Sequence, residues 1–169
     1  PMGAGLASSA SGFAALTLAG CAAFEQDRSD VTLSILARQG SGSACRSLWG
    51  GWVEWPKGQR EDGLDSHGRP IAPPDHWDVA MVVAVLYKGP KAVSSTEGMN
   101  RTMETSPFYE GWVASNEADL RPAREAVLAK DLEALGQIME RSALRMHASM
   151  LAANPPIRYW KSNSVWAMD

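Results

Sequence analysis

The spacing of apolar residues predicts that the first forty residues form two helices. Residues 8–24 carry apolar side chains among alanines on all sides, which is typical of a buried helix. Residues 30–39 show a one-sided helical pattern, in which three apolar side chains should face inward: Val31, Ile35 and Leu36. Ser29 is a suitable N-cap for this second helix, and Gly40 is a suitable residue to end it.

The next segment predicts a short helix followed by a strand and a turn-rich connection. A glycine–serine loop at residues 40–47 provides the start of a short helix. Residues 52–55, Trp-Val-Glu-Trp, are predicted to form a strand after two glycines. Residues 56–74 are polar and rich in glycine and proline, as expected for a hairpin and an exposed connection.

A boundary near Asp75 divides the chain into two predicted domains, 1–74 and 75–169. The second domain opens with residues 79–87, a continuous apolar run rich in β-branched side chains. Such a run is typical of a strand that is covered on both faces. We therefore expect this strand to anchor the second domain.

The remainder of the second domain is predicted to be helical. Hydroxyl side chains at 94–96 are suited to cap a helix that runs to Thr105, and Ser106-Pro107 should start another. The longest amphipathic pattern covers residues 131–153 and ends at Asn-Pro-Pro. A last helix begins at Ser162 or Asn163 and lasts barely two turns, so we interpret the chain as an internal fragment of a longer protein.

Composition narrows the class of protein. A net charge of −3 argues against broad nucleic-acid binding, which requires concentrated basic surface. No apolar run reaches the roughly 20 residues that a membrane-spanning helix needs. Two widely separated cysteines and three scattered histidines form neither a disulfide framework nor a metal motif. We expect a globular protein of the reducing cytoplasm, with no nucleic acid and no membrane among its partners.

The first twelve residues place glycines and hydroxyls directly before the first predicted helix. Gly3 and Gly5 permit backbone conformations that are closed to other residues, and amides at a helix start favour an anion such as a polyphosphate. Alternatively, the small residues serve only close packing. A lipoprotein cleavage box at residues 18–21 would need a basic region before it, but no Lys or Arg precedes Arg28.

The second glycine–serine loop combines groups that can bind an anion with a positively charged side chain. Ser41, Ser43 and Arg46 fall at the start of the predicted short helix. A guanidinium binds phosphate oxygens with two hydrogen bonds, and hydroxyls complete the shell. The alternative is an ordinary N-cap beside a solvated arginine. Two such loops in one domain suggest two phosphorylated ligands that face each other.

Four segments resemble a known family. The sequence Pro-Met-Gly-Ala-Gly-Leu-Ala-Ser-Ser-Ala at 1–10 is similar to the phosphate loop of the GHMP kinase superfamily, and Ala7 is typical of its mevalonate diphosphate decarboxylase branch. The sequence Ala-Arg-Gln-Gly-Ser-Gly-Ser-Ala-Cys-Arg-Ser-Leu-Trp-Gly-Gly at 37–51 resembles the signature of that branch. Residues 93–99 and 147–159 match the same branch in the same order.

The resemblance implies an α+β fold with the two domains of a GHMP kinase. Residues 1–74 would be part of the ribosomal-protein-S5-like N-terminal domain, and residues 75–169 part of the ferredoxin-like C-terminal domain. The implied reaction is ATP-dependent decarboxylation of mevalonate 5-diphosphate to isopentenyl diphosphate, through phosphorylation of the 3-hydroxyl. A phosphomevalonate decarboxylase, a mevalonate 3-kinase and a noncatalytic binding or dimerisation remnant are the alternatives. The family also implies Mg²⁺ and a homodimer.

The resemblance also implies roles for individual residues. The first loop would cradle the ATP phosphates, with Ser8 also on Mg²⁺, through Gly3, Ala4, Gly5, Leu6, Ala7, Ser8 and Ser9. The substrate would be held by Ser41, Gly42, Ser43, Arg46, Ser94 and Ser95. Arg46 and Lys91 would act electrostatically in catalysis, although Lys91 could equally be a solvated turn lysine.

Three further observations complete the expectation. Cys45 is interpreted as a small core residue and His147 as a packed histidine, and neither is given a role. The Asp-Ala-Gly-Pro-Asn segment that carries the aspartate of this family does not occur in these 169 residues. We therefore expect these residues alone to be inactive and the full-length protein to be an enzyme.

Overall fold

The computed structural model describes residues 8–86, 89 and 92–168 and divides the chain into two compact units. Unit 1 spans Pro1–Ala80 and unit 2 spans Met81–Asp169. Helices make up most of the regular structure in the described part of each unit.

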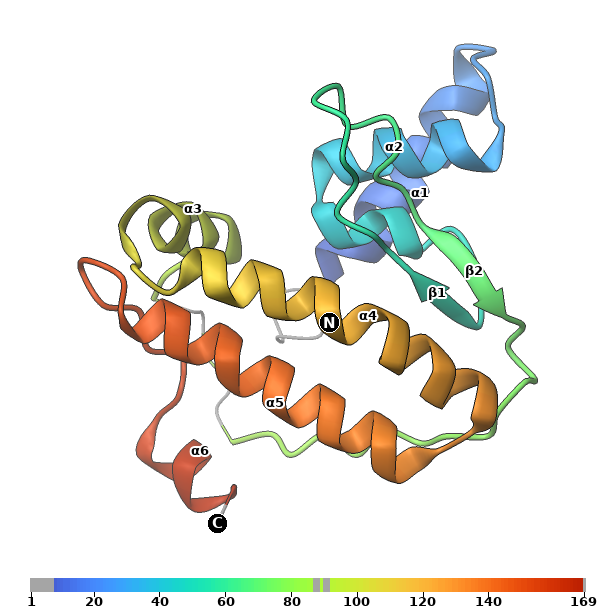
Figure 1. Ribbon diagram of the computed structural model, residues 1–169. Helices are drawn as coiled ribbons and strands as arrows, with labels where there is room; N and C mark the ends of the chain where they lie inside the picture. Colours follow the sequence, from blue (N-terminus) through green and yellow to red (C-terminus); the bar gives the residue numbers. More distant parts are fainter. Residues whose placement is uncertain (1–7, 87–88, 90–91, 169) are drawn as a thin grey trace. The chain divides into compact units, whose positions relative to one another are not determined.

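Unit 1 combines its helices with one small hairpin. Its elements in chain order are α1 (Ser8–Ala23), α2 (Asp30–Gly40), the short 3₁₀ helix η1 (Gly42–Arg46), β1 (Trp52–Glu54) and β2 (Arg69–Ala72). Helices α1 and α2 lie side by side, and η1 packs against both of them (Figure 1). The helix starts, the short helix and the strand predicted at 52–55 are confirmed within one or two residues, and the hairpin partner β2 lies inside the predicted connection 56–74.

A network of side chains explains where α2 begins. Ser29 is the N-cap, and its hydroxyl accepts a hydrogen bond from the Thr32 amide at 3.4 Å. The Asp27 carboxylate accepts hydrogen bonds from the hydroxyls of Thr32 at 2.6 Å and Ser29 at 2.8 Å. These bonds hold the pKa of Asp27 below its ordinary value, and the bond from Thr32 has the largest effect. These bonds fix where α2 begins, and the candidate loop at 40–47 lies at the opposite end of this helix.

The inward face of α2 differs from the prediction. Val31 and Leu36 are exposed by 46% and 39%, while the buried residues are Leu33, Ser34 and Ala37. The reason is close packing, because small side chains let α2 approach its neighbours. At Gly40 the ring of Phe13 occupies the space that a side chain would need, which joins α1 to the end of α2.

The first helix is confirmed, but its predicted burial is wrong within the described residues. Only its small side chains are covered: Ala10, Ala14 and Cys21. Leu16 and Phe24 are exposed by 65% and 76%. The described neighbours of α1 in unit 1 cover one side of a helix that is apolar on all sides.

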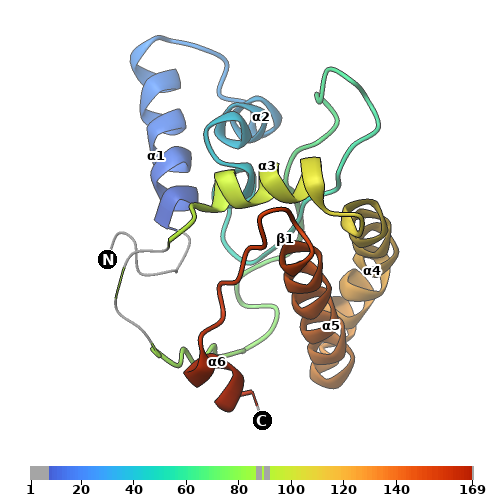
Figure 2. The same cartoon turned by 90° about the vertical axis from the view of Figure 1, so that its left-hand side faces the viewer.

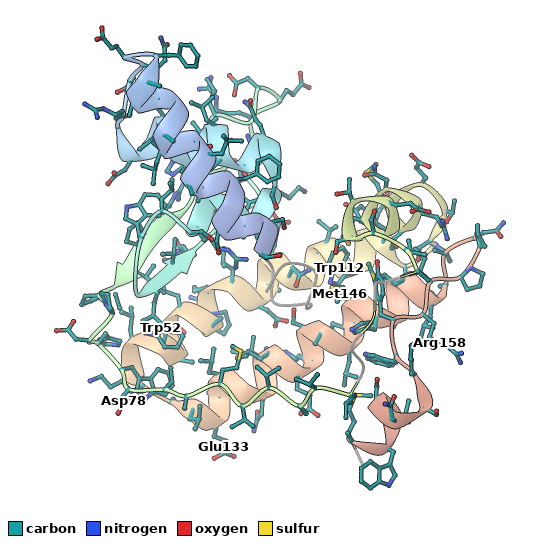
Figure 3. All side chains as sticks on the ribbon, turned by 180° about the vertical axis from the view of Figure 1, so that it is seen from behind. Trp52, Asp78, Trp112, Glu133, Met146 and Arg158 are labelled. Atoms are coloured by element: carbon teal, nitrogen blue, oxygen red, sulfur yellow. The ribbon has the colours of Figure 1, made fainter. Side chains whose placement is uncertain are left out.

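The hairpin of unit 1 is held by tryptophan side chains and a buried serine. Strands β1 and β2 pair antiparallel, with an irregularity in register at Trp52. The ring of Trp52, labelled in Figure 3, stacks on that of Trp77 with a centroid distance of 5.4 Å. The indole N–H of Trp55 donates to the Ser66 hydroxyl at 2.9 Å, and Ser66 donates to the Pro56 carbonyl at 3.1 Å.

Unit 2 is helical in the part that the structure describes. It contains α3 (Ser95–Thr105), α4 (Tyr109–Ala129), α5 (Leu132–Leu151) and α6 (Ser162–Trp166), all close to their predicted positions. Helices α4 and α5 run side by side, and α3 lies across one end of the pair (Figure 1, Figure 2).

The turn between α4 and α5 is short and capped on both sides. Lys130 takes the left-handed conformation with φ of 57° and ends α4, and the Asp131 carboxylate accepts from the Ala134 amide to begin α5. Farther along the pair, Asp119 on α4 bonds to Arg141 at 2.7 Å and to Arg145 at 3.0 Å. Side-chain bonds thus fix the register between the two helices.

The strand predicted at 79–87 is wrong for residues 79–86, and Tyr87 lies outside the described residues. Residues 79–86 have no regular secondary structure and are exposed, with Met81 at 82% and Val82 at 94%. A strand forms only where a neighbour accepts and donates its backbone hydrogen bonds, and no described segment of unit 2 does so. The apolar pattern indicates that a segment is suited to burial. It does not show that the segment has a neighbouring strand with which to pair.

Neighbouring positions on α5 allow a test of the α4–α5 packing. Ile138 is 8% exposed and Met139 is 56% exposed. We expect Ile138→Ala to lower the free energy of unfolding by about 2–4 kcal/mol, because it removes buried methyl groups and leaves a cavity. Met139→Ala should change it by less than about 0.5 kcal/mol. Urea unfolding followed by circular dichroism measures both, and equal losses would contradict this packing.

Candidate functional site

The second predicted loop of unit 1 contacts the first turn of α1. Ser9 lies in the first turn of α1, and the Ser41 hydroxyl donates to the Ser9 hydroxyl at 3.4 Å. Ser8 begins the helix and is half-exposed. The first turn of α1 carries no acidic side chain, so its amide groups present a positive end without a competing carboxylate. Five members of the first predicted loop lie outside the described residues: Gly3, Ala4, Gly5, Leu6 and Ala7.

The short helix η1 buries two residues and leaves the residues on either side of them accessible to solvent. Ala44 and Cys45 are fully buried, whereas Ser43 is half-exposed and Arg46 is exposed. At Gly42 a side chain would meet the ring of Trp55 at 2.9 Å, so the backbone there lies directly on that ring. The buried residues anchor η1, and the two polar residues remain accessible to a ligand.

Arg46 is the cation of this part of the site. Its guanidinium carbon lies 6.0 Å from the centroid of the Trp55 ring, at the outer range of a cation–π contact. Among the described residues no carboxylate forms a salt bridge with Arg46. A guanidinium placed on an aromatic ring and not neutralised by a described carboxylate is available to an anionic ligand.

Cys45 is a core residue, as interpreted from the sequence. Burial raises the pKa of its thiol, and the positive charges of Arg46 and Arg38 only partly oppose this effect. A buried thiol with a raised pKa is a poor nucleophile. The chemistry of η1 therefore depends on hydroxyls, amides and a guanidinium.

A residue that the sequence analysis missed holds η1 in place. Ser34 on α2 is fully buried, and its hydroxyl donates to the Cys45 carbonyl at 2.9 Å. The same oxygen accepts a hydrogen bond from the Gly68 amide at 2.8 Å. A serine within an amphipathic pattern is normally read as solvent-facing, so the pattern carried no signal for this role.

In unit 2 the predicted substrate-binding serines lie at the start of α3. Ser94 is the N-cap, and its hydroxyl accepts from the Glu97 amide at 3.1 Å. Ser95 lines a hollow of about 350 Å³ whose other walls are Met99, Met146, His147, Met150 and Tyr159. Met146 is labelled on α5 in Figure 3. Lys91, the other predicted catalytic residue, lies outside the described residues.

Tyr159 fixes the backbone beside these serines. Its hydroxyl donates to the Ser94 carbonyl at 3.1 Å. Burial raises the pKa of Tyr159, with a smaller contribution from Glu97, so the phenol keeps its proton near neutral pH. A side chain at Gly98 would meet the Tyr159 hydroxyl at 2.6 Å, which explains the glycine inside α3.

His147 is packed between aromatic rings, in agreement with its interpretation from the sequence. Its ring lies 4.2 Å from that of Trp160 and 6.4 Å from that of Tyr159, centroid to centroid. Burial lowers the pKa of His147, so the ring is mainly neutral at neutral pH. It forms one wall of the hollow beside Ser95.

Two kinds of feature are not found among the described residues. They contain no group of three or more His, Cys, Asp or Glu side chains arranged to hold a metal ion. No helix among them is both long enough and apolar enough to cross a membrane.

Comparison with solved structures defines the class of fold. The chain superimposes with a TM-score of 0.85 and 43% identity on a structure described as "MDDEF in complex with MVAPP, AMPPCP and Magnesium", covering 99% of this chain and 51% of that one. A mevalonate diphosphate decarboxylase from Trypanosoma brucei gives a TM-score of 0.86 at 33% identity, covering 99% of this chain and 44% of that one. The predicted α+β fold of the mevalonate diphosphate decarboxylases is confirmed.

Sequence comparison identifies the family. Residues 1–68 match the diphosphomevalonate decarboxylase-like N-terminal domain, and residues 81–169 match the mevalonate 5-diphosphate decarboxylase C-terminal domain. A diphosphomevalonate decarboxylase from Ganoderma lucidum is 44% identical over 165 residues, which are 94% of this chain and 40% of that protein. The chain belongs to the diphosphomevalonate decarboxylase family, and it spans about 40% of the length of the curated relatives it matches.

The contact between Gly98 and Tyr159 provides a test of the geometry beside Ser94. Within a helix, Gly→Ala normally stabilises by about 0.5–1 kcal/mol. We expect Gly98→Ala to destabilise the protein instead, because the new methyl group would meet the Tyr159 hydroxyl. In a Tyr159→Phe background the same change should become neutral or stabilising. Thermal unfolding of the four proteins measures this reversal, and destabilisation of equal size in both backgrounds would contradict the contact.

Proposed function

We propose that the full-length protein catalyses the ATP-dependent decarboxylation of mevalonate 5-diphosphate to isopentenyl diphosphate. The observation that carries this proposal is the hydrogen bond between Ser9 and Ser41, which joins the start of α1 to the loop before η1. Arg46 lies four residues after Gly42 in the same short helix, with no described carboxylate to neutralise it. Two anion-binding elements in contact suit a reaction between a nucleotide and a phosphorylated substrate.

The first element would bind the nucleotide. Phosphate oxygens would accept hydrogen bonds from the amides at the start of α1, together with the loop residues Gly3, Ala4, Gly5, Leu6, Ala7, Ser8 and Ser9. A homologous structure is described as containing AMPPCP and magnesium, which supports ATP and Mg²⁺ here. Mg²⁺ would bind together with the phosphates, and the Ser8 hydroxyl would be one of its ligands.

The second element would bind the substrate. Its hydroxyls, amides and guanidinium suit the diphosphate and carboxylate of mevalonate 5-diphosphate, and they come from Ser41, Gly42, Ser43 and Arg46. Ser94 and Ser95 would add contacts from unit 2. Phosphorylation of the tertiary 3-hydroxyl makes it a leaving group, and loss of phosphate and carbon dioxide then forms the double bond. Arg46 and Lys91 would stabilise charge at these anionic groups.

The proposal also includes the location, the oligomeric state and the domain bounds of the enzyme. We place the protein in the cytoplasm as a homodimer, with the N-terminal domain at 1–74 and the C-terminal domain at 75–169. The 169 residues alone should be inactive, because the family's Asp-Ala-Gly-Pro-Asn segment does not occur in them.

A substrate panel tests the reaction. The full-length protein is incubated with ATP and Mg²⁺ and with mevalonate, its 5-phosphate or its 5-diphosphate in turn. We expect phosphate and carbon dioxide to be released only with the diphosphate. Carbon dioxide from the monophosphate alone would identify a phosphomevalonate decarboxylase, and phosphorylation of mevalonate without carbon dioxide would identify a 3-kinase. No turnover of any of the three would indicate a noncatalytic protein.

Removal of the Arg46 guanidinium tests the site itself. Arg46→Ala should lower kcat/KM for mevalonate 5-diphosphate by about a hundredfold or more, the size of loss typical of a preorganised electrostatic contact. Arg28→Ala is a matched control, because Arg28 is exposed and precedes the start of α2, whereas η1 follows its end. Steady-state kinetics measure both variants, and unchanged kinetics for Arg46→Ala would refute the assignment.

A further inference from the structure

The hydroxyl of Ser34 joins three segments of unit 1 that are distant in sequence. Ser34 lies on α2, the carbonyl that accepts its proton belongs to Cys45 in η1, and the amide that donates to it belongs to Gly68 before β2. The side chain is fully buried, so water cannot replace either bond. One oxygen atom therefore satisfies a carbonyl and an amide that would otherwise be unpaired in the core.

The carbonyl that Ser34 holds is adjacent to the proposed substrate-binding groups. Cys45 lies between Ser43 and Arg46, and the Cys45 carbonyl is part of the peptide unit that leads to Arg46. A five-residue 3₁₀ helix has poor hydrogen-bond geometry of its own and depends on outside contacts. Packing of Ala44 and Cys45 holds one side of η1 against its neighbours, but apolar packing places a peptide group less precisely than a hydrogen bond does.

The hydrogen bond from Ser34 adds a directional constraint to this packing. The Ser34 bond fixes the orientation of the Cys45 carbonyl, and a fixed peptide plane limits the directions in which the next side chain can extend. Gly68 completes the arrangement, because a side chain there would meet the Cys45 carbonyl oxygen at 2.5 Å and the ring of Trp49 at 2.6 Å. The position of η1 is thus determined from two sides.

We propose that Ser34 is a positioning residue that sets the orientation of Arg46, and with it the productive geometry of the substrate. The proposal rests on the proposed function for the role of Arg46, and on the structure alone for the bond to η1. Ser34 itself does not touch the substrate. Its removal should release η1 locally and leave the rest of unit 1 folded.

The first part of the proposal is that Ser34 holds η1 in place. In the full-length protein, alkylation of Cys21 and Cys45 tests this part. Cys45 lies in η1 and Cys21 in α1, and both are buried, so alkylation of each reports local opening. Ser34→Ala should increase the rate of iodoacetamide alkylation at Cys45 by about tenfold, the effect of one lost buried hydrogen bond, with Cys21 nearly unchanged. Mass spectrometry of the separate peptides measures both rates. An equal increase at the two cysteines, or no increase at Cys45, overturns the proposal.

The functional half is tested by a double-mutant cycle. Ser34→Ala should lower kcat/KM for mevalonate 5-diphosphate by about tenfold, because misplacement of a catalytic group is costly. In an Arg46→Ala background the same change should have almost no effect, since the group that Ser34 positions is gone. A control, Ser149→Ala, removes a buried hydroxyl in unit 2 that donates to the Met146 carbonyl, and its effect should be small in both backgrounds.

Each outcome of the cycle has a distinct meaning. Effects of Ser34→Ala and Arg46→Ala that multiply independently overturn the positioning role and leave the proposed function intact. If Arg46→Ala alone has no effect on kcat/KM, the role assigned to Arg46 fails, and the role of Ser34 in catalysis fails with it. The proposed function itself fails only if the substrate panel shows no turnover of mevalonate 5-diphosphate. All assays are run at a temperature well below the unfolding midpoint of every variant.

Discussion

Very small side chains allow α1, α2 and η1 to approach one another closely, and the candidate site in unit 1 depends on that approach. Ala37 and Ala44 are fully buried, and Gly40 has no space for a side chain beside the ring of Phe13. At such short separations the start of α1 and the loop before η1 come within reach of a hydrogen bond between Ser9 and Ser41. A larger residue at any of these contacts would move the start of α1 away from the loop before η1. Ala37, Gly40 and Ala44 therefore serve close packing, and this packing does not conflict with the proposed binding of ligands by the neighbouring loops.

Arg46 differs from the described arginines that form salt bridges. Arg101 pairs with Glu97, and Arg141 pairs with Asp119. Such pairs neutralise the charge of the cation. Arg46 instead lies on the ring of Trp55, which offers attraction without a competing negative charge. Arg46 therefore carries its positive charge in the same short helix as Ser43, without a salt bridge to a described carboxylate, and such a charge favours binding of a phosphate or carboxylate.

Local signals predicted most of the helices, because the groups that begin and end them are close in sequence. Ser29, Ser94 and Asp131 each cap the helix that follows, and each was readable from residue type and position. The roles of Ser34 and Tyr159 depend on partners 11 to 65 positions away, which no periodicity encodes. The inward face of α2 was misjudged for the same reason, because the pattern favours large apolar residues and the actual contact uses small ones. Ser41, Ser43 and Arg46 were suggested by residue chemistry and the other site residues largely by motif resemblance, and the structure adds the contact between Ser9 and Ser41 and the position of Arg46 beside Trp55.

The exposed apolar surfaces of the two units have a common physical origin. Helix α1 is apolar on all sides and residues 79–86 are apolar throughout, yet the described parts of their units cover them only in part. Leaving side chains such as Leu16 and Val82 in water forfeits about 1.5 kcal/mol or more for each one that could be buried. The hydrogen-bonded site elements do not share this property, because Ser34, Ala44 and Cys45 are fully covered by contacts within unit 1. The geometry around Arg46 is therefore set by local contacts that are complete within the unit, while the burial of α1 and of residues 79–86 requires contacts beyond those that the described residues make.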